Sequence, residues 1–186
     1  MSDFDKAFAF ALIWEGVYSD DHDDPGNWTG GDVGKGERRG TKYGVSARAY
    51  PMLDIQNLTK EEAATNVYLP DYWIKYKCDQ MPYPVNIVHF DCCVNVGNIT
   101  LRPKGVVEKH NRANKMLQRA ASVEDDGIIG PSSLRAIQND NPQFLALSAI
   151  NERDAYYETL AKQSAYFASC LKGWKNRTEA LRAIIT

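Results

Sequence analysis

Apolar residues at helical spacing limit the fold of this chain more than any other feature of its sequence. Side chains three and four positions apart lie on the same face of a helix. Near the start of the chain, the residues with this spacing are Phe4, Ala7, Phe8, Ala11 and Leu12. We therefore expect a helix over residues 3–14, with Asp3 as its N-cap and Gly16 marking its end.

Several later segments are expected to be helical because of their spacing or their end signals. Thr59 followed by Glu62 forms a capping box. It begins a helix that Pro70 ends or kinks, with residues 70–78 continuing helically. The other expected helices cover residues 84–97, where a buried strand is the alternative, 110–122, a segment that starts at Pro131, 142–171 and 173–184.

Strand signals are few. Residues 19–40 are rich in Gly, Asp and Asn, and we expect them to form an irregular, exposed loop. The segment TKYGVS, residues 41–46, is short and is expected to provide one strand of a small hairpin. The balance of about seven or eight helices against so little strand predicts a mainly α fold with a small β-hairpin after the first helix.

Composition places the chain among ordinary globular proteins. Its 186 residues are 44% hydrophobic, which is enough for one domain, or for one domain with a small lobe. The formal net charge of −2 lacks the basic balance that nucleic-acid binding requires. The four cysteines show no CxxC spacing, so free thiols are expected rather than a zinc ribbon or a redox motif.

The first residues do not resemble a secretory signal peptide. Asp3 and Asp5 precede the apolar run and Glu15 closes it, whereas a signal peptide begins with positive charge. No apolar stretch reaches the roughly 18 residues of a membrane span. We therefore expect synthesis in the cytoplasm, with action on any target outside it only after release or export.

The run IWEGVYSDDHDDPG, residues 13–26, contains one glutamate, four aspartates and a histidine. A calcium loop of the EF-hand type needs acids at alternating positions and a closing glutamate. If the loop began at Asp21, its third ligand position would fall on Pro25, and no glutamate would close it. No metal ion is therefore expected. Because aspartate is common in surface turns, a simple loop role is the alternative for each of these aspartates.

Glu15 stands apart from the other acids because it follows an apolar helix and lies beside Trp14. The negative end of the helix dipole and aromatic surroundings both disfavour the charged form of a carboxyl group. A glutamate that keeps its proton can act as a general acid. Glycosidic cleavage needs such an acid together with a second carboxylate, which an aspartate on the following loop can supply.

The order of motifs along the chain resembles glycoside hydrolase family 108, the lysozyme-like muramidases of phages and bacteria. The motifs that carry the resemblance are WEGVYSDDHDDPG, TKYGVS, LTKEEAATNVYLPDYW, HFDCCVNVG, MLQRAASVEDDGIIGPSSL and GWKNR. They imply a lysozyme-like helical fold, with residues 1–82 as the catalytic part and residues 83–186 as a peptidoglycan-binding part packed on it. They also imply a monomer that binds peptidoglycan glycan strands and needs no cofactor.

The resemblance also assigns catalytic residues. Glu15 would be the general acid, Asp24 would hold or activate the attacking water, and Thr41 would orient that water through its hydroxyl group. The link between Asp24 and Thr41 is longer than is usual in the family. The alternative carriers of the second role are therefore Asp20, Asp21 and Asp23.

Four further residues are candidates for substrate binding. Tyr18 and Tyr43 would line the sugar cleft. Asp91 and Asn95 would share one face of a helix, where they would touch the N-acetyl group or brace the site. A buried structural network is the alternative for this second pair.

The predicted reaction is hydrolysis of the β-1,4 bond between N-acetylmuramic acid and N-acetylglucosamine, with inversion at the anomeric carbon. A lytic transglycosylase that uses Glu15 alone is one alternative, and it would leave an anhydromuramyl end. A non-catalytic module for wall binding or secretion is another, and it would bind sacculi without releasing reducing sugar.

Overall fold

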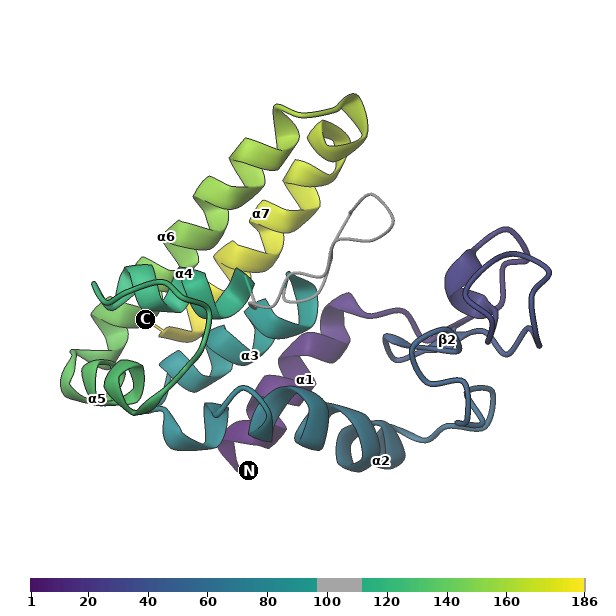
Figure 1. Ribbon diagram of the computed structural model, residues 1–186, viewed down its shortest axis with the longest axis horizontal. Coiled ribbons are helices and arrows are strands. Elements are labelled where there is room, and N and C mark those ends of the chain that lie inside the picture. Colours follow the sequence, from purple (N-terminus) through teal and green to yellow (C-terminus); the bar gives the residue numbers. More distant parts are fainter. Residues whose placement is uncertain (97–111, 186) are drawn as a thin grey trace. The chain divides into compact units, whose positions relative to one another are not determined.

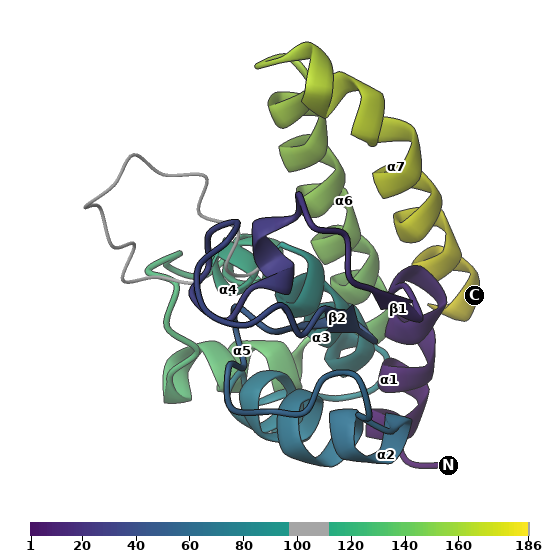
Figure 2. The same cartoon turned by 90° about the vertical axis from the view of Figure 1, so that its right-hand side faces the viewer.

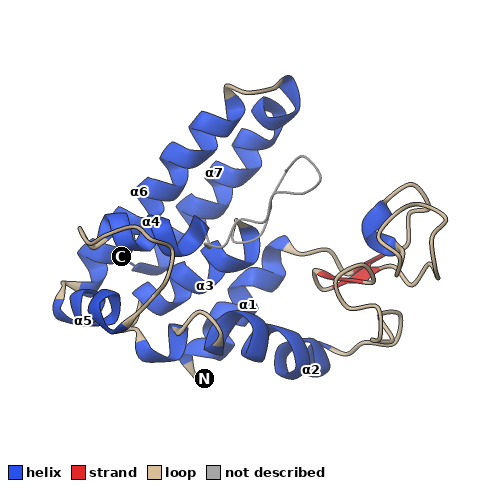
Figure 3. Cartoon of the chain, in the orientation of Figure 1, coloured by secondary structure: helices blue, strands red, loops and turns tan. Residues whose placement is uncertain are grey.

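The computed structural model describes residues 1–96 and 112–185, and its contacts divide the chain into two compact units (Figure 1). One unit contains Met1–Ala7 and Tyr72–Thr186, and the other contains Phe8–Asp71. The described residues are mainly helical, and their sheet has three short strands (Figure 3). The predicted mainly α fold is therefore confirmed. We predicted a catalytic part over residues 1–82 and a peptidoglycan-binding part over residues 83–186. The two compact units do not test this functional division, which stays a prediction.

The first helix, α1, spans Asp3–Trp14 as expected, but its cap is Ser2. The Ser2 hydroxyl accepts a hydrogen bond from the backbone N–H of Asp5 at 3.1 Å, and the Asp5 carboxylate accepts one from the Ser2 N–H at 2.8 Å. This reciprocal pair is the arrangement of a capping box. Asp3 instead accepts a hydrogen bond from the Asn86 side chain at 3.0 Å, so the expectation that Asp3 is the cap was wrong by one residue.

The helix after Thr59 continues through Pro70. The capping box with Glu62 is present and begins α2, Lys60–Ala63. A π-helix, η2, follows directly over Ala64–Ile74 and contains Pro70. In an α-helix, the ring of a proline clashes with the carbonyl group four residues earlier. A π-helix instead bonds each N–H to the carbonyl five residues earlier, and this change moves the clashing carbonyl group away from the ring.

The unit that contains Tyr72–Thr186 is built around α3, Val85–Asn95, which is buried along most of its length. The helix predicted over residues 84–97 is therefore confirmed for its described part, and the strand alternative is excluded. The other elements are η3 (Cys78–Gln80), α4 (Arg112–Ala120), α5 (Pro131–Asn139), α6 (Pro142–Ala161) and α7 (Ala165–Ile185). α3 packs on α4 and α6, and α6 runs beside α7 (Figure 2). Residues 110 and 111 of the helix predicted over 110–122 lie outside the described residues.

The single helix predicted over residues 142–171 is wrong, because α6 and α7 are separate helices. The Ser164 hydroxyl accepts a hydrogen bond from the N–H of Phe167 at 3.2 Å. Ser164 therefore acts as the N-cap that starts α7. α7 then continues through Gly173, where the next helix was expected to begin.

Lowering the pH from 7 to about 4 is expected to destabilise the fold through His89. This residue is buried in α3, and burial lowers the pKa of His89 from 6.5 to about 4, although a hydrogen bond with Asn114 opposes the shift. The unfolded chain binds a proton near pH 6.5, whereas the folded chain does so only near pH 4. Stability is therefore present above pH 6.5 and is lost, by about 3 kcal/mol, as the pH falls through this window.

Urea unfolding at several pH values between 7 and 4 checks this expectation. The variant His89→Gln has no ionisable ring, so its unfolding free energy should fall less steeply over the same range. If the unfolding free energy fell equally steeply with pH in both proteins, His89 would not be the source of the lost stability.

Candidate active site

The hairpin that contacts Glu15 is formed entirely by residues 41–46. β2 (Thr41–Lys42) pairs antiparallel with β3 (Val45–Ser46), and β1 (Tyr18–Ser19) pairs with the other edge of β2. We expected TKYGVS to provide one strand, but this segment forms two strands and the turn between them. Both turn residues have positive φ, 52° at Tyr43 and 75° at Gly44, as a two-residue type I′ turn requires.

Glu15 lies directly after α1, with its carboxyl group against this turn. A Cβ atom placed on Gly44 would lie 2.9 Å from Oε2 of Glu15 and 3.1 Å from its Cδ. The backbone N–H of Tyr43 also reaches the carbonyls of Gly16 and Val17, at 3.2 Å each. The turn therefore contacts both the Glu15 side chain and the backbone that follows it. Glu15 itself is half-buried.

The loop of residues 26–40 closes on itself. The N–H of Thr29 donates to the carbonyl of Glu37 at 2.9 Å, and the N–H of Glu37 donates to the Thr29 hydroxyl at 2.9 Å. Trp28 and Arg38 form a bridge just outside this pair. The long link between the acidic run and Thr41 therefore doubles back, and its two ends meet.

Asn27 joins Thr41 to the acidic run. Its side chain is fully buried, and its amide nitrogen donates to the carbonyl of Asp21 at 2.9 Å. The amide oxygen must therefore accept, and the Thr41 hydroxyl donates to it at 2.8 Å. Because the Thr41 proton is used in this way, the Thr41 oxygen is oriented to accept a hydrogen from another group.

Asp24 caps η1, the short turn Pro25–Asn27. One carboxylate oxygen, Oδ1, accepts a hydrogen bond from the N–H of Gly26 at 2.8 Å, and the side chain is exposed. η1 ends at Asn27, which binds Thr41. Asp24 and Thr41 are therefore linked through one three-residue turn.

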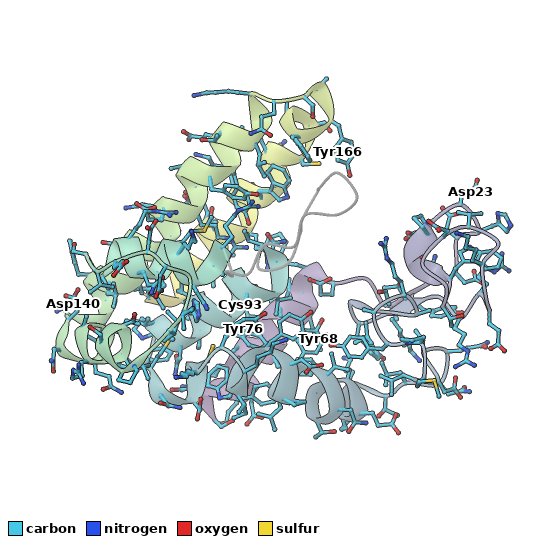
Figure 4. The ribbon with its side chains drawn as sticks, in the orientation of Figure 1. Asp23, Tyr68, Tyr76, Cys93, Asp140 and Tyr166 are labelled. Carbon is cyan, nitrogen blue, oxygen red and sulfur yellow. The ribbon has the colours of Figure 1, made fainter. Side chains whose placement is uncertain are left out.

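The other acids of the run have partners within the loop. Asp20 lies 3.6 Å from the guanidinium of Arg38. Asp21 accepts a hydrogen bond from the N–H of Asp23 at 3.0 Å, and the Asp23 carboxylate lies 2.9 Å from the ring of His22. Figure 4 shows Asp23 at the outer edge of this part of the chain. These contacts are those of turn residues, which makes Asp24 the stronger candidate for the second carboxylate.

Tyr18 and Tyr43 both lie on the small sheet. Tyr18 is exposed on β1, and its ring lies against Gly40, where a Cβ atom would come within 2.7 Å of it. Tyr43 is half-buried, and the Lys42 ammonium lies 5.6 Å from the centre of its ring. Contact with sugar stays a prediction for both residues.

Asp91 and Asn95 lie on α3, in a buried structural network. Arg153 and Arg177 each donate to the Asp91 carboxylate, at 2.7 Å and 2.6 Å, and Asp91 has no exposed surface. Burial alone would raise the pKa of Asp91, but the two arginines outweigh it and hold that pKa below its usual value. Asn95 accepts a hydrogen bond from the Tyr157 hydroxyl. These contacts are those expected for the structural alternative, and contact with substrate stays a prediction for Asp91 and Asn95.

Sequence reasoning missed three residues that build the site. Asn27 and Gly44 are described above, and the third is Tyr68, whose hydroxyl donates to the carbonyl of Tyr43 at 2.7 Å. Gly44 could have been found from the demand of a type I′ turn for positive φ. Nothing local marks Asn27 or Tyr68, because their partners are distant in sequence.

Two negative findings apply to residues 1–96 and 112–185. They include no group of three His, Cys, Asp or Glu side chains placed to hold a metal ion. None of their helices is both long and apolar enough to cross a membrane.

Two family models match the chain in order. The model described as Glycosyl hydrolase 108 matches residues 8–97, and the model described as Predicted Peptidoglycan domain matches residues 112–179. The solved structure of Brucella abortus SagA is 26% identical to this chain in sequence and superposes on it with a TM-score of 0.70. The alignment covers 98% of this chain and 92% of the SagA chain. No curated protein matches the chain significantly. Residues 8–97 therefore form a glycosyl hydrolase 108 domain, and the chain has a lysozyme-like fold and is a glycoside hydrolase that acts on peptidoglycan.

Proposed function

We propose that this hydrolase cleaves the β-1,4 bond between N-acetylmuramic acid and N-acetylglucosamine, with Glu15 as the general acid. The observation that carries the proposal is that one small hairpin both contacts Glu15 and carries Thr41. Its turn contacts the Glu15 carboxyl group at Gly44, and its first strand carries Thr41. Glycosidic cleavage by inversion needs an acid and a separately held water.

Thr41 and Asp24 would hold that water. The Thr41 oxygen accepts one hydrogen of the water, because its own proton is donated to Asn27. The Asp24 carboxylate accepts the other hydrogen and takes up the proton when the water attacks. Glu15 gives its proton to the leaving glycosidic oxygen. One C–O bond forms as the other breaks on the opposite face of the sugar, so the product has inverted configuration.

The competing reaction is that of a lytic transglycosylase, in which a hydroxyl of the sugar replaces the water. Such a reaction needs Glu15 but gives Thr41 and Asn27 no role. The hydrogen bond between Thr41 and the buried Asn27, which orients the Thr41 oxygen, therefore supports hydrolysis. Asp20 and Asp21 are weaker candidates for the water-holding carboxylate, because Asp20 lies beside Arg38 and Asp21 closes a turn.

Product analysis tests the proposal. Purified sacculi are digested in water enriched in heavy oxygen, and the fragments are reduced with borohydride and identified by mass spectrometry. We expect every new reducing end to be N-acetylmuramic acid that carries one heavy oxygen. Proton spectra taken early in the digestion of soluble glycan strands should show the α-anomer first. Anhydromuramyl ends would contradict hydrolysis, and reducing N-acetylglucosamine would contradict the assigned bond.

A further inference from the structure

We propose that Tyr68 is a positioning residue for Glu15, and that it acts through the Tyr43–Gly44 turn. Tyr68 belongs to η2 and is buried, with 3% of its surface exposed (Figure 4). Its hydroxyl donates to the carbonyl of Tyr43 at 2.7 Å. The inference rests on the proposed role of Glu15 as the general acid.

Gly44 is the point at which Tyr68 and Glu15 converge. A Cβ atom built on Gly44 would lie 2.5 Å from the Tyr68 hydroxyl oxygen and 2.9 Å from Oε2 of Glu15. Real side chains do not approach other atoms so closely, so only glycine fits here without displacing one of these groups. The Glu15 carboxyl group and the Tyr68 hydroxyl thus both lie against the side of Gly44 on which a side chain would project.

The turn needs an external contact to keep its geometry. Tyr43 has a positive φ of 52°, which is unfavourable for a residue with a side chain and persists where surrounding contacts impose it. The Tyr68 hydroxyl binds the Tyr43 carbonyl, while the Tyr43 N–H reaches the carbonyls of Gly16 and Val17. Tyr43, the residue before Gly44, is therefore held both at its N–H and at its carbonyl.

The ring of Tyr68 has a separate role from its hydroxyl. It packs against Phe8 of α1 with the ring centres 5.1 Å apart. The variant Tyr68→Phe keeps this packing and removes the hydroxyl that donates to the turn. A change in activity in this variant would therefore report on the position of the turn and of Glu15.

We expect Tyr68→Phe to lower kcat by about tenfold while KM stays within about twofold, because misplacement of a catalytic group affects the transition state more than substrate binding. Rates are measured on soluble glycan strands, and folding is checked by circular dichroism and urea unfolding. A wild-type kcat, or a change in KM alone, would overturn the inference.

Gly44→Ala has a matched control elsewhere in the same unit. Gly34 has almost the same backbone angle, with φ of 78° against 75°, but a Cβ atom there would meet nothing within 4 Å. Gly34→Ala therefore carries the backbone strain without the contacts to Glu15 and Tyr68. We expect kcat to fall by about tenfold or more in Gly44→Ala and to stay within about twofold in Gly34→Ala. Equal losses in the two variants would contradict the inference.

The double variant Glu15→Gln/Tyr68→Phe separates failure of this inference from failure of the proposed function. If Tyr68 acts through Glu15, the double variant should be no slower than Glu15→Gln alone, within about twofold. A further tenfold loss would show that Tyr68 acts independently. Full activity in Glu15→Gln would instead reject Glu15 as the acid, whatever Tyr68→Phe does.

Discussion

Replacement of Glu15 by glutamine is expected to lower the rate of peptidoglycan cleavage by about a thousandfold or more, because loss of a general acid removes a contribution of roughly 10²–10⁴. Glutamine has nearly the same size and fits the same place against Gly44, but its amide cannot protonate the leaving oxygen. The fold should be retained, since Glu15 is only half-buried. Release of reducing sugar from purified sacculi measures the activity.

Glu37→Gln provides the matched control for this prediction. Glu37 is exposed, lies in the loop of residues 26–40 and pairs with Arg39 at 2.6 Å. The same chemical change there should leave the rate within about twofold, because an exposed ion pair contributes little. If Glu15→Gln kept more than about a tenth of the activity of Glu37→Gln, Glu15 would not be the acid that the reaction requires.

Replacement of Asp91 by asparagine is expected to lower the free energy of unfolding by about 3–5 kcal/mol, the usual cost of removing one partner from a buried ion pair. Asp91 is fully buried between Arg153 and Arg177, which come from α6 and α7. The change leaves two arginines without their buried negative charge. Urea unfolding followed by circular dichroism measures the difference.

The exposed ion pair between Lys175 and Glu158 serves as a comparison that shows how much burial adds to the cost of breaking an ion pair. Its atoms lie 2.6 Å apart, and its side chains are 37% and 53% exposed. Glu158→Gln should cost less than about 1 kcal/mol, since water and salt screen such a pair. Equal costs for Asp91→Asn and Glu158→Gln would mean that the buried cluster does not hold α3 to its neighbouring helices.

Local signals predicted the helices well and their ends less well. The capping box at Thr59 and the proline at the start of α5 act within a few residues, so the sequence alone reveals them. The break before α7 depends on a single serine, Ser164, whose signal is weak beside the strong helical spacing on either side. The passage of a helix through Pro70 depends on a change in helix type, which spacing does not report.

The candidate site shows the same division. The order of motifs along the chain singled out Glu15, Asp24 and Thr41, because each lies in a short motif that can be recognised in the sequence. Asn27 and Tyr68 escaped, since their hydrogen-bond partners lie 14 and 25 residues away. Contacts over such distances follow from the tertiary fold, and a polar residue inside an ordinary loop or helix carries no mark of them.

The closed loop of residues 26–40 separates the length of this segment from the position of Thr41. Because Thr29 bonds to Glu37 and the N–H of Gly30 donates to the carbonyl of Lys35, residues 31–34 form a tip beyond the last crosslink. Residues added to or removed from this tip would change the loop without moving its two ends. The same chain segment can therefore vary in length among related enzymes, or accept an inserted peptide, while Asn27 continues to hold the Thr41 hydroxyl.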